Sequence, residues 1–212
     1  LNWWTREPES GSVWQSVWVS SNAAAAPNQA VCAVDLDGDG DLDLAAAGGS
    51  YSAGFFIRWY INLDGAGRTW AASGIANDSY EVPGSGLPNV DGLKSGDIDG
   101  DGDADLLLIP GHDYYWGTFS YWENRDGMGG AWSNHPICES DYMYYDFKRS
   151  ADLADIDQDG DMDLLVPYSG SRRFNVWMNR EAEGNGWTAT SLGLSSSYYE
   201  YQSLAGVLID LD

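Results

Sequence analysis

The chain has 212 residues, and its 33 acidic and 10 basic side chains give a formal net charge of −23 at pH 7. That length is enough for one sizeable core or for an array of repeats. Nucleic acid is excluded as an expected partner because phosphate contacts need clusters of Lys and Arg, and only Lys148-Arg149 and Arg172-Arg173 come close. No apolar run approaches the roughly 18 residues of a membrane-spanning helix, so we expect no membrane span.

The N-terminal part of the chain predicts a two-stranded hairpin, with strands at residues 2–4 and 13–19 around a turn at residues 9–11. Two aromatic residues, Trp4 and Trp14, lie ten residues apart across this turn. The same spacing recurs three more times along the chain, at Tyr60 and Trp70, Trp122 and Trp132, and Trp177 and Trp187. This recurrence indicates one type of hairpin used repeatedly.

The next element is an acidic loop between two predicted strands. Its sequence, at residues 35–43, is Asp35-Leu36-Asp37-Gly38-Asp39-Gly40-Asp41-Leu42-Asp43. Two further copies follow at residues 97–105 and 155–163, so that the loops start 62 and 58 residues apart. Every copy has Asp at positions 1, 3, 5, 7 and 9 and Gly at position 6.

This spacing of carboxylates fits a calcium ion. Ca²⁺ takes about six to eight oxygen ligands, and a tight turn assisted by Gly lets one short segment supply most of them. The candidate donors are the side chains at positions 1, 3, 5 and 9 and the backbone carbonyl at position 7. We therefore predict three calcium ions, whose ligands are Asp35, Asp37, Asp39, Asp41 and Asp43 in the first loop, Asp97, Asp99, Asp101, Asp103 and Asp105 in the second, and Asp155, Asp157, Asp159, Asp161 and Asp163 in the third.

The loops are not EF-hands, because an EF-hand needs a bidentate Glu at position 12 and helices on both sides. Position 12 is Ala46, Leu108 or Val166, and the segments around each loop are apolar and strand-like. The remaining alternative is a solvated acidic turn without an ion. Five Asp residues within one loop would repel one another strongly unless they were neutralised, and the pattern occurs three times, which favours the metal.

One repeat unit is predicted to contain four strands, at residues 30–34, 42–48, 55–62 and 69–75 of the first full copy. No segment shows helical periodicity or helix caps. Four antiparallel strands repeated at a fixed period are typical of a β-propeller blade. We therefore predict an all-β fold of about 3.5 to 4 blades, with a calcium loop in the first hairpin of each unit and the repeated aromatic residues packed between blades.

We expect a single repeat domain over residues 1–212. It divides into a partial blade at 1–29, blades at 30–92, 93–150 and 151–203, and the first strand of an incomplete blade at 204–212. The last segment carries Asp210 and Asp212, which would hold a fourth calcium ion if another segment completed the loop. That strand would either close a ring with the N-terminal hairpin or join another copy of the chain, because an unpaired strand is a template for association.

The loop Asp-x-Asp-x-Asp-Gly-x-x-Asp between strands, at a period near sixty and with Trp-x-Asn before a Gly-rich turn, resembles the FG-GAP/VCBS repeat family. Such repeats form the blades of integrin α-subunit propellers and occur in many secreted bacterial proteins. The resemblance extends over essentially the whole chain. It implies calcium at the Asp residues named above and a β-propeller of usually about seven blades, whereas this chain carries only about four repeats.

The sequence favours a non-enzymatic, calcium-stabilised structural or adhesion protein that assembles with copies of itself, head to tail, into a filament or larger particle. The alternative is a recognition propeller that binds glycans or cell-surface proteins through the Tyr-rich segments 78–93, 139–150 and 195–203, since Tyr offers contact area and a hydroxyl at low entropic cost. A remoter alternative is an accessory fragment of a secreted polysaccharide-active enzyme.

Catalysis is not expected, because His112 and His135 have no Ser or Cys partner in a recognisable motif. Paired carboxylates of a hydrolase stay as an alternative. Calcium loops of this kind fill at extracellular concentrations, which favours a secreted or surface-associated protein. Pairing of Cys32 with Cys138 stays open, and Asn77 begins a glycosylation sequon.

Overall fold

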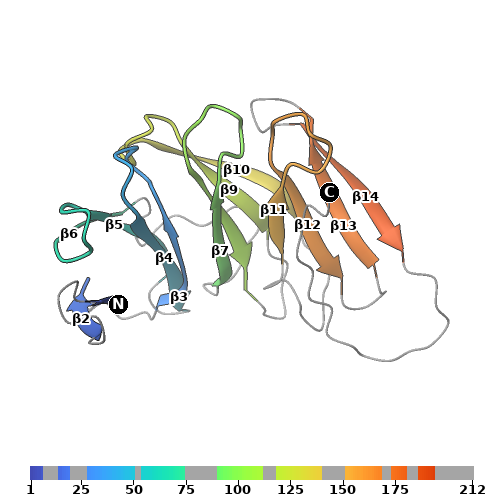
Figure 1. Ribbon diagram of the computed structural model, residues 1–212. Coiled ribbons are helices and arrows are strands. Elements are labelled where there is room, and N and C mark those ends of the chain that lie inside the picture. Colours follow the sequence, from blue (N-terminus) through green and yellow to red (C-terminus); the bar gives the residue numbers. More distant parts are fainter. Residues whose placement is uncertain are drawn as a thin grey trace.

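The computed structural model describes residues 1–6, 14–19, 28–50, 54–74, 90–111, 118–139, 151–168, 173–180 and 186–193. These residues form fourteen strands in three four-stranded sheets and one two-stranded sheet, which lie side by side in chain order (Figure 1). The predicted all-β fold of blade-like antiparallel sheets is thereby confirmed. No helix in the described ranges is long and apolar enough to cross a membrane.

The strands follow one another as hairpins within each sheet. The two-stranded sheet contains β1 (Asn2–Arg6) and β2 (Trp14–Trp18). The four-stranded sheets contain β3 (Asn28–Val34), β4 (Asp43–Ser50), β5 (Gly54–Asn62) and β6 (Trp70–Gly74); β7 (Val90–Gly96), β8 (Asp105–Pro110), β9 (Thr118–Asn124) and β10 (Trp132–Glu139); and β11 (Asp152–Ala154), β12 (Asp163–Tyr168), β13 (Arg173–Asn179) and β14 (Trp187–Gly193). In the first full unit, the predicted strand limits differ from the observed ones by one or two residues at most.

The second strand of each four-stranded sheet is apolar on both faces. All six residues of β8 are buried, and in β4 the run from Leu44 to Ala47 is buried as well. A strand alternates between apolar and polar residues when only one face of its sheet is covered, and it becomes a continuous apolar run when both faces are covered. β4 and β8 therefore lie in the interior of the stack, with a neighbouring sheet on either side, whereas the sheet of β12 has one neighbouring sheet among the described residues (Figure 1).

Each contact between neighbouring sheets has its own apolar core. The sheets β3–β6 and β7–β10 share a core that includes Leu36, Trp59 and Trp122, and Ile98 takes part in the core between β7–β10 and β11–β14. Leu36 and Ile98 belong to the acidic loops, at position 2 of each. The loops are thus anchored between sheets by one apolar side chain, which is 1% exposed in the first loop and 0% exposed in the second.

The prediction that the repeated aromatic residues pack between blades fits most of them but not the N-terminal pair. Tyr60 and Trp122 are buried, whereas Trp4 and Trp14 are 57% and 61% exposed. Within the described residues, the β1–β2 sheet has a neighbouring sheet on one side only, and its outer face is therefore uncovered (Figure 1).

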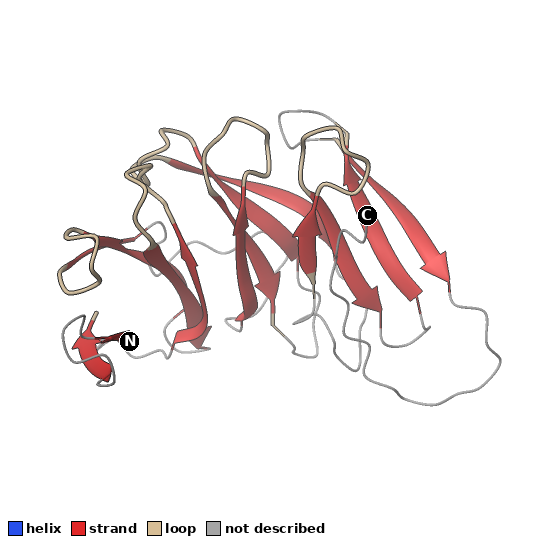
Figure 2. Ribbon diagram, viewed as in Figure 1, coloured by secondary structure: helices blue, strands red, loops and turns tan. Residues whose placement is uncertain are grey.

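The loops between the first two strands of the three longer sheets lie along the same edge of the stack (Figure 2). Several predicted features fall outside the described residues: His112, Asn77, Asp210, Asp212, the segment 204–212 and most of the three Tyr-rich segments. Cys32 and Cys138 are both described, and no disulfide bond joins them.

Candidate metal centres

The first carboxylate of each loop organises the turn around itself. Asp35 accepts hydrogen bonds from the backbone N–H groups of Gly38 at 2.9 Å and Gly40 at 3.0 Å. Asp155 accepts hydrogen bonds from the N–H groups of Asp159, one position further along the loop, and Gly160, both at 3.1 Å, and Asp97 accepts the N–H of Gly102 at 3.1 Å. Asp side chains often bond to backbone a few residues ahead in this way, and the bonds close a tight turn. The loop is therefore curled so that later carboxylates face the first one.

Positions 4 and 6 of the loops need left-handed backbone. Position 6 is Gly in all three copies, with φ of 91° at Gly40, 97° at Gly102 and 105° at Gly160. Position 4 is Gly in two copies, but the third copy has Gln158 with φ of 61°, the one non-Gly residue with positive φ among the described residues. An L-residue with a Cβ is disfavoured there.

Replacing Gln158 with Gly is expected to stabilise the protein by about 0.5–1 kcal/mol, because the relieved steric cost exceeds the added flexibility of the unfolded chain. Urea unfolding at fixed calcium concentration measures the change. The matched control is Gly38→Gln at the same position of the first loop, where a Cβ has ordinary space, and we expect a loss of similar size. A Gln158→Gly variant less stable than the parent chain would contradict the argument.

The last Asp of each loop is buried and ties the loop to the third strand of its sheet. Asp43 and Asp105 are 1% exposed and Asp163 is 0% exposed. In the second loop, one oxygen of Asp105 accepts the N–H of Ile98 at 2.9 Å and the other accepts the N–H of Asn124 at 2.8 Å. The other two loops repeat the pair of bonds at distances from 2.7 to 3.0 Å. This carboxylate is therefore a structural brace, whichever ion the loop holds.

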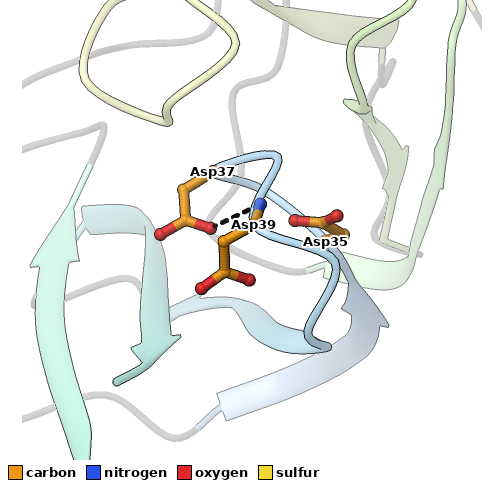
Figure 3. Close-up of side chains that lie close together, drawn as sticks. All are labelled: Asp35, Asp37 and Asp39. Atoms are coloured by element: carbon orange, nitrogen blue, oxygen red, sulfur yellow. Dashed lines mark hydrogen bonds between the residues drawn. The ribbon is translucent and has the colours of Figure 1, made fainter. Parts of the chain in front are cut away.

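Three carboxylates of each loop lie close together. Their oxygens lie within 4.8 Å of one another in the groups Asp35, Asp37 and Asp39; Asp97, Asp99 and Asp101; and Asp155, Asp157 and Asp163. Figure 3 shows the first group, in which the N–H of Asp39 contacts the Asp37 carboxylate at 3.4 Å. The other predicted ligands lie outside these groups, at position 7 of every loop, at position 9 of the first two loops and at position 5 of the third.

Burial, and to a smaller extent the charges of neighbouring carboxylates, raise the pKa of several Asp side chains in the loops. Burial is the largest cause that raises the pKa of Asp105 to about 7, against the opposing effect of its two backbone hydrogen bonds. Burial and the charge of Asp101 raise the pKa of Asp99 to about 6. The pKa values of Asp43 and Asp163 are raised in the same direction, mainly by burial. Without a cation, the folded loops therefore bind protons more readily than free Asp.

The donor set fits a hard divalent cation. Each group offers only carboxylate oxygens, which are the ligands that calcium prefers. In the second group, Oδ1 of Asp97 is buried and has no hydrogen-bond partner among the described residues. A buried carboxylate oxygen without a partner is costly, and a metal ligand bond would satisfy it. The third group differs, because Arg180 forms an ion pair with Asp157 at 2.6 Å.

A set of Asn residues, two of which belong to the Trp-x-Asn motif, joins neighbouring sheets, and their spacing in the sequence does not by itself indicate this role. Nδ2 of Asn124 donates to the carbonyl of Leu36 in the preceding sheet at 3.0 Å, and Nδ2 of Asn179 donates to the carbonyl of Ile98 at 2.7 Å. Both Asn side chains are buried. The first two acidic loops are therefore held from their own sheet by the last Asp and from the following sheet by an Asn, whereas the third is held by its last Asp and its position-2 residue, Ile156, is 38% exposed.

Four-stranded antiparallel sheets, stacked in chain order with an acidic loop at the same edge of each, define a β-propeller-type repeat protein. The family model described as FG-GAP-like repeat matches residues 35–108 and 97–166, which is more than half of the chain. The chain belongs to the FG-GAP-like repeat family, as its loop motif had indicated. No curated protein matches the chain.

Proposed function

We propose that this protein is a non-enzymatic structural module of the extracellular space, in which each of the three acidic loops binds one calcium ion. The observation that carries the proposal is the grouping of three carboxylates in every loop, with oxygens within 4.8 Å of one another. The first two loops are also fixed between two sheets, so an ion there would stiffen the contact between blades. Loops of this kind fill at extracellular calcium concentrations.

The ligands in this proposal are the side chains at positions 1, 3, 5 and 9 and the carbonyl at position 7 of each loop, that is, the fifteen Asp residues named above. The ion would neutralise the mutual repulsion of the carboxylates and hold the loop closed. In the third loop, Arg180 competes for Asp157. We therefore expect two tighter sites and one weaker site.

A calcium titration followed by calorimetry and native mass spectrometry tests the proposal. We expect three ions per chain, and two ions after Asp37→Asn or Asp99→Asn, because each change weakens one loop. Asp64→Asn is the matched control, since Asp64 is exposed and lies in a turn outside the loops. Arg180→Gln should tighten the third site. Saturable binding of fewer than three ions by the parent chain would contradict the assignment.

The described residues support a structural role over a catalytic one. His135 is engaged in its own hairpin, where Nε2 lies 2.7 Å from Glu123 and the ring stacks on Tyr121 with centroids 4.8 Å apart. The grouped carboxylates are committed to the loops. An extracellular scaffold or adhesion module is therefore the function that the geometry favours.

We further propose that the protein associates with copies of itself. The support is a group of exposed aromatic side chains on the β1–β2 sheet, where Trp4, Trp14 and Trp18 are 57%, 61% and 70% exposed. Exposed apolar patches of this kind mark interaction surfaces. Light scattering in millimolar calcium should give a mass well above the 23.1 kDa of one chain. A strictly monomeric mass over the accessible concentration range would remove self-association from the proposal.

A further inference from the structure

Two contacts between sheets are built in the same way. In the sheets β7–β10 and β11–β14, the third strand ends in an Asn that donates to the carbonyl at position 2 of the preceding acidic loop, as Asn124 does to Leu36 at 3.0 Å and Asn179 does to Ile98 at 2.7 Å. The Gly-rich turn that follows lies against the same loop, since a Cβ at Gly129 would come within 3.7 Å of the Leu36 carbonyl. The ring of Trp132 covers this turn and donates to the carbonyl of Gly129 at 2.9 Å. Asn, turn and Trp together form a seat for an acidic loop.

The sheet β3–β6 has the same seat, but it faces a pocket. Asn62, Gly67 and Trp70 occupy the places of Asn124, Gly129 and Trp132, and Trp70 again donates to the carbonyl of Gly67, at 3.1 Å. These residues line a pocket of about 400 Å³ together with Trp3, Trp4 and Trp14 of the β1–β2 sheet. Nδ2 of Asn62 contacts the carbonyl of Leu42 in its own loop at 3.3 Å, the longest of the three Asn contacts.

The two strands β1 and β2 correspond to the third and fourth strands of a four-stranded sheet. Arg6 pairs with Trp14 as Asn62 pairs with Trp70, which places Trp3 at the position of Trp59. Trp3 packs on Trp70 with ring centroids 6.3 Å apart, as Trp59 packs on Trp132 at 5.3 Å.

The apolar core between the β1–β2 sheet and the sheet β3–β6 lacks the residues that, in the next contact, come from the acidic loop and the second strand of the preceding sheet. It contains Leu44, Ala46 and Tyr60 from one sheet and Leu1, Trp3, Val19 and Trp70 at its margin. The corresponding core of the next contact also contains Leu36 from an acidic loop and Ala45 and Ala47 from a second strand. β1 pairs only with β2 in the described part of the chain. Its second edge and the pocket therefore adjoin the place that two strands and their loop occupy in the other sheets.

We propose that this pocket is the seat of a further acidic loop of the Asp-x-Asp-x-Asp-Gly kind, carried by a β-hairpin that adds to the second edge of β1. The apolar residue at position 2 of that loop would enter the core beside Leu44, and its carbonyl would accept the Asn62 amide. The geometry of the seat at Asn124, Gly129 and Trp132, with the matching bond from Asn179 to Ile98, carries this docking. Only its dependence on calcium rests on the function proposed above.

A chain with an added copy of residues 28–56 directly before Leu1 tests the docking, because Leu1 stands at the register position of Ile57. The added copy contains no Trp, so Trp fluorescence reports only on the original rings. We expect a rise in melting temperature of more than about 5 °C and weaker acrylamide quenching, because Trp4 and Trp14 become covered.

The matched control carries Leu36→Asp in the added copy alone, which keeps the loop but places a charge in the core. Quenching and melting temperature that are equal in both extended chains and in the parent chain would overturn the proposal. The segment 204–212 is the competing occupant, and increased quenching after deletion of residues 206–212 from the parent chain would show that it fills the pocket instead.

Repeating the comparison without calcium separates the two proposals. Docking that persists in chelator supports the seat and contradicts the role of calcium. Docking that needs calcium, with four ions bound in place of three, supports both.

Discussion

Removal of calcium is expected to lower the melting temperature of the protein by roughly 15–30 °C. A ligand that binds only the folded state at about 100 times its Kd stabilises that state by about 2.7 kcal/mol. Three such sites contribute about 8 kcal/mol, and a domain of this size changes its melting temperature by about 2–4 °C for each kcal/mol. Calorimetry with calcium in excess and then with chelator measures the difference. A melting curve that the chelator leaves unmoved would contradict the calcium assignment.

Magnesium provides the control for this experiment. It requires octahedral geometry at short distances and keeps several waters, so a loop of closely spaced carboxylates suits it poorly. Adding magnesium to the chelated protein should therefore restore little of the lost stability. Full restoration would show that the loops need any divalent charge rather than calcium.

The pH dependence of stability should have opposite signs in the calcium-free and the calcium-bound protein. Without metal, the pKa values of Asp99 and Asp105 in the folded protein are about 6 and about 7, above the ordinary 3.8. Between pH 3.8 and about 7, the folded state therefore binds more protons than the unfolded state, and the free energy of unfolding falls as the pH rises through this range. Acidifying calcium-stripped protein from about pH 7.5 to about 5.5 should raise its melting temperature. With calcium present, the same acidification should lower the melting temperature, because protons compete with the ion for the carboxylates.

The sequence predicted those parts of the protein that depend on short stretches of chain. The acidic loops are set by Asp and Gly at fixed positions, and the strands around them are apolar runs bounded by turns, so both could be found without a structure. The contact of Asn124 with Leu36 spans 88 residues, and nothing local to either residue indicates it. The same holds for Trp4 and Trp14, because their exposure depends on which sheets are present beside them.

The loop chemistry shows the same division between local and distant causes. The spacing of the motif predicts position 9 as a ligand, but its brace to the third strand depends on where Asn62 and Asn124 end their strands. Arg180, directly after the end of β13, reaches Asp157 from 23 residues away in sequence. A motif therefore identifies the candidate donors, whereas the fold decides which other bonds each donor also makes.

The brace leads to the second large expected effect, a loss of about 3–5 kcal/mol in calcium-free protein when Asp105 is replaced by Ala. The change removes the acceptor of two buried N–H groups, those of Ile98 and Asn124. Leaving a buried donor without a partner costs about 1–3 kcal/mol. Asp105→Asn should lose less, because the amide oxygen still accepts one of the two bonds. Urea unfolding in chelator measures both variants.

Asp126 supplies the matched control, because one of its oxygens also accepts two backbone N–H groups, from Met128 at 3.2 Å and Gly130 at 3.0 Å. Asp126 lies exposed in a turn, so water can replace the lost acceptor, and Asp126→Ala should cost only about 1 kcal/mol. If Asp105→Ala costs no more than this in chelator but far more in calcium, the carboxylate acts only as a ligand. If the large cost persists in chelator, the last Asp of each loop holds the blade together before any ion binds, and calcium adds to a loop that is already folded.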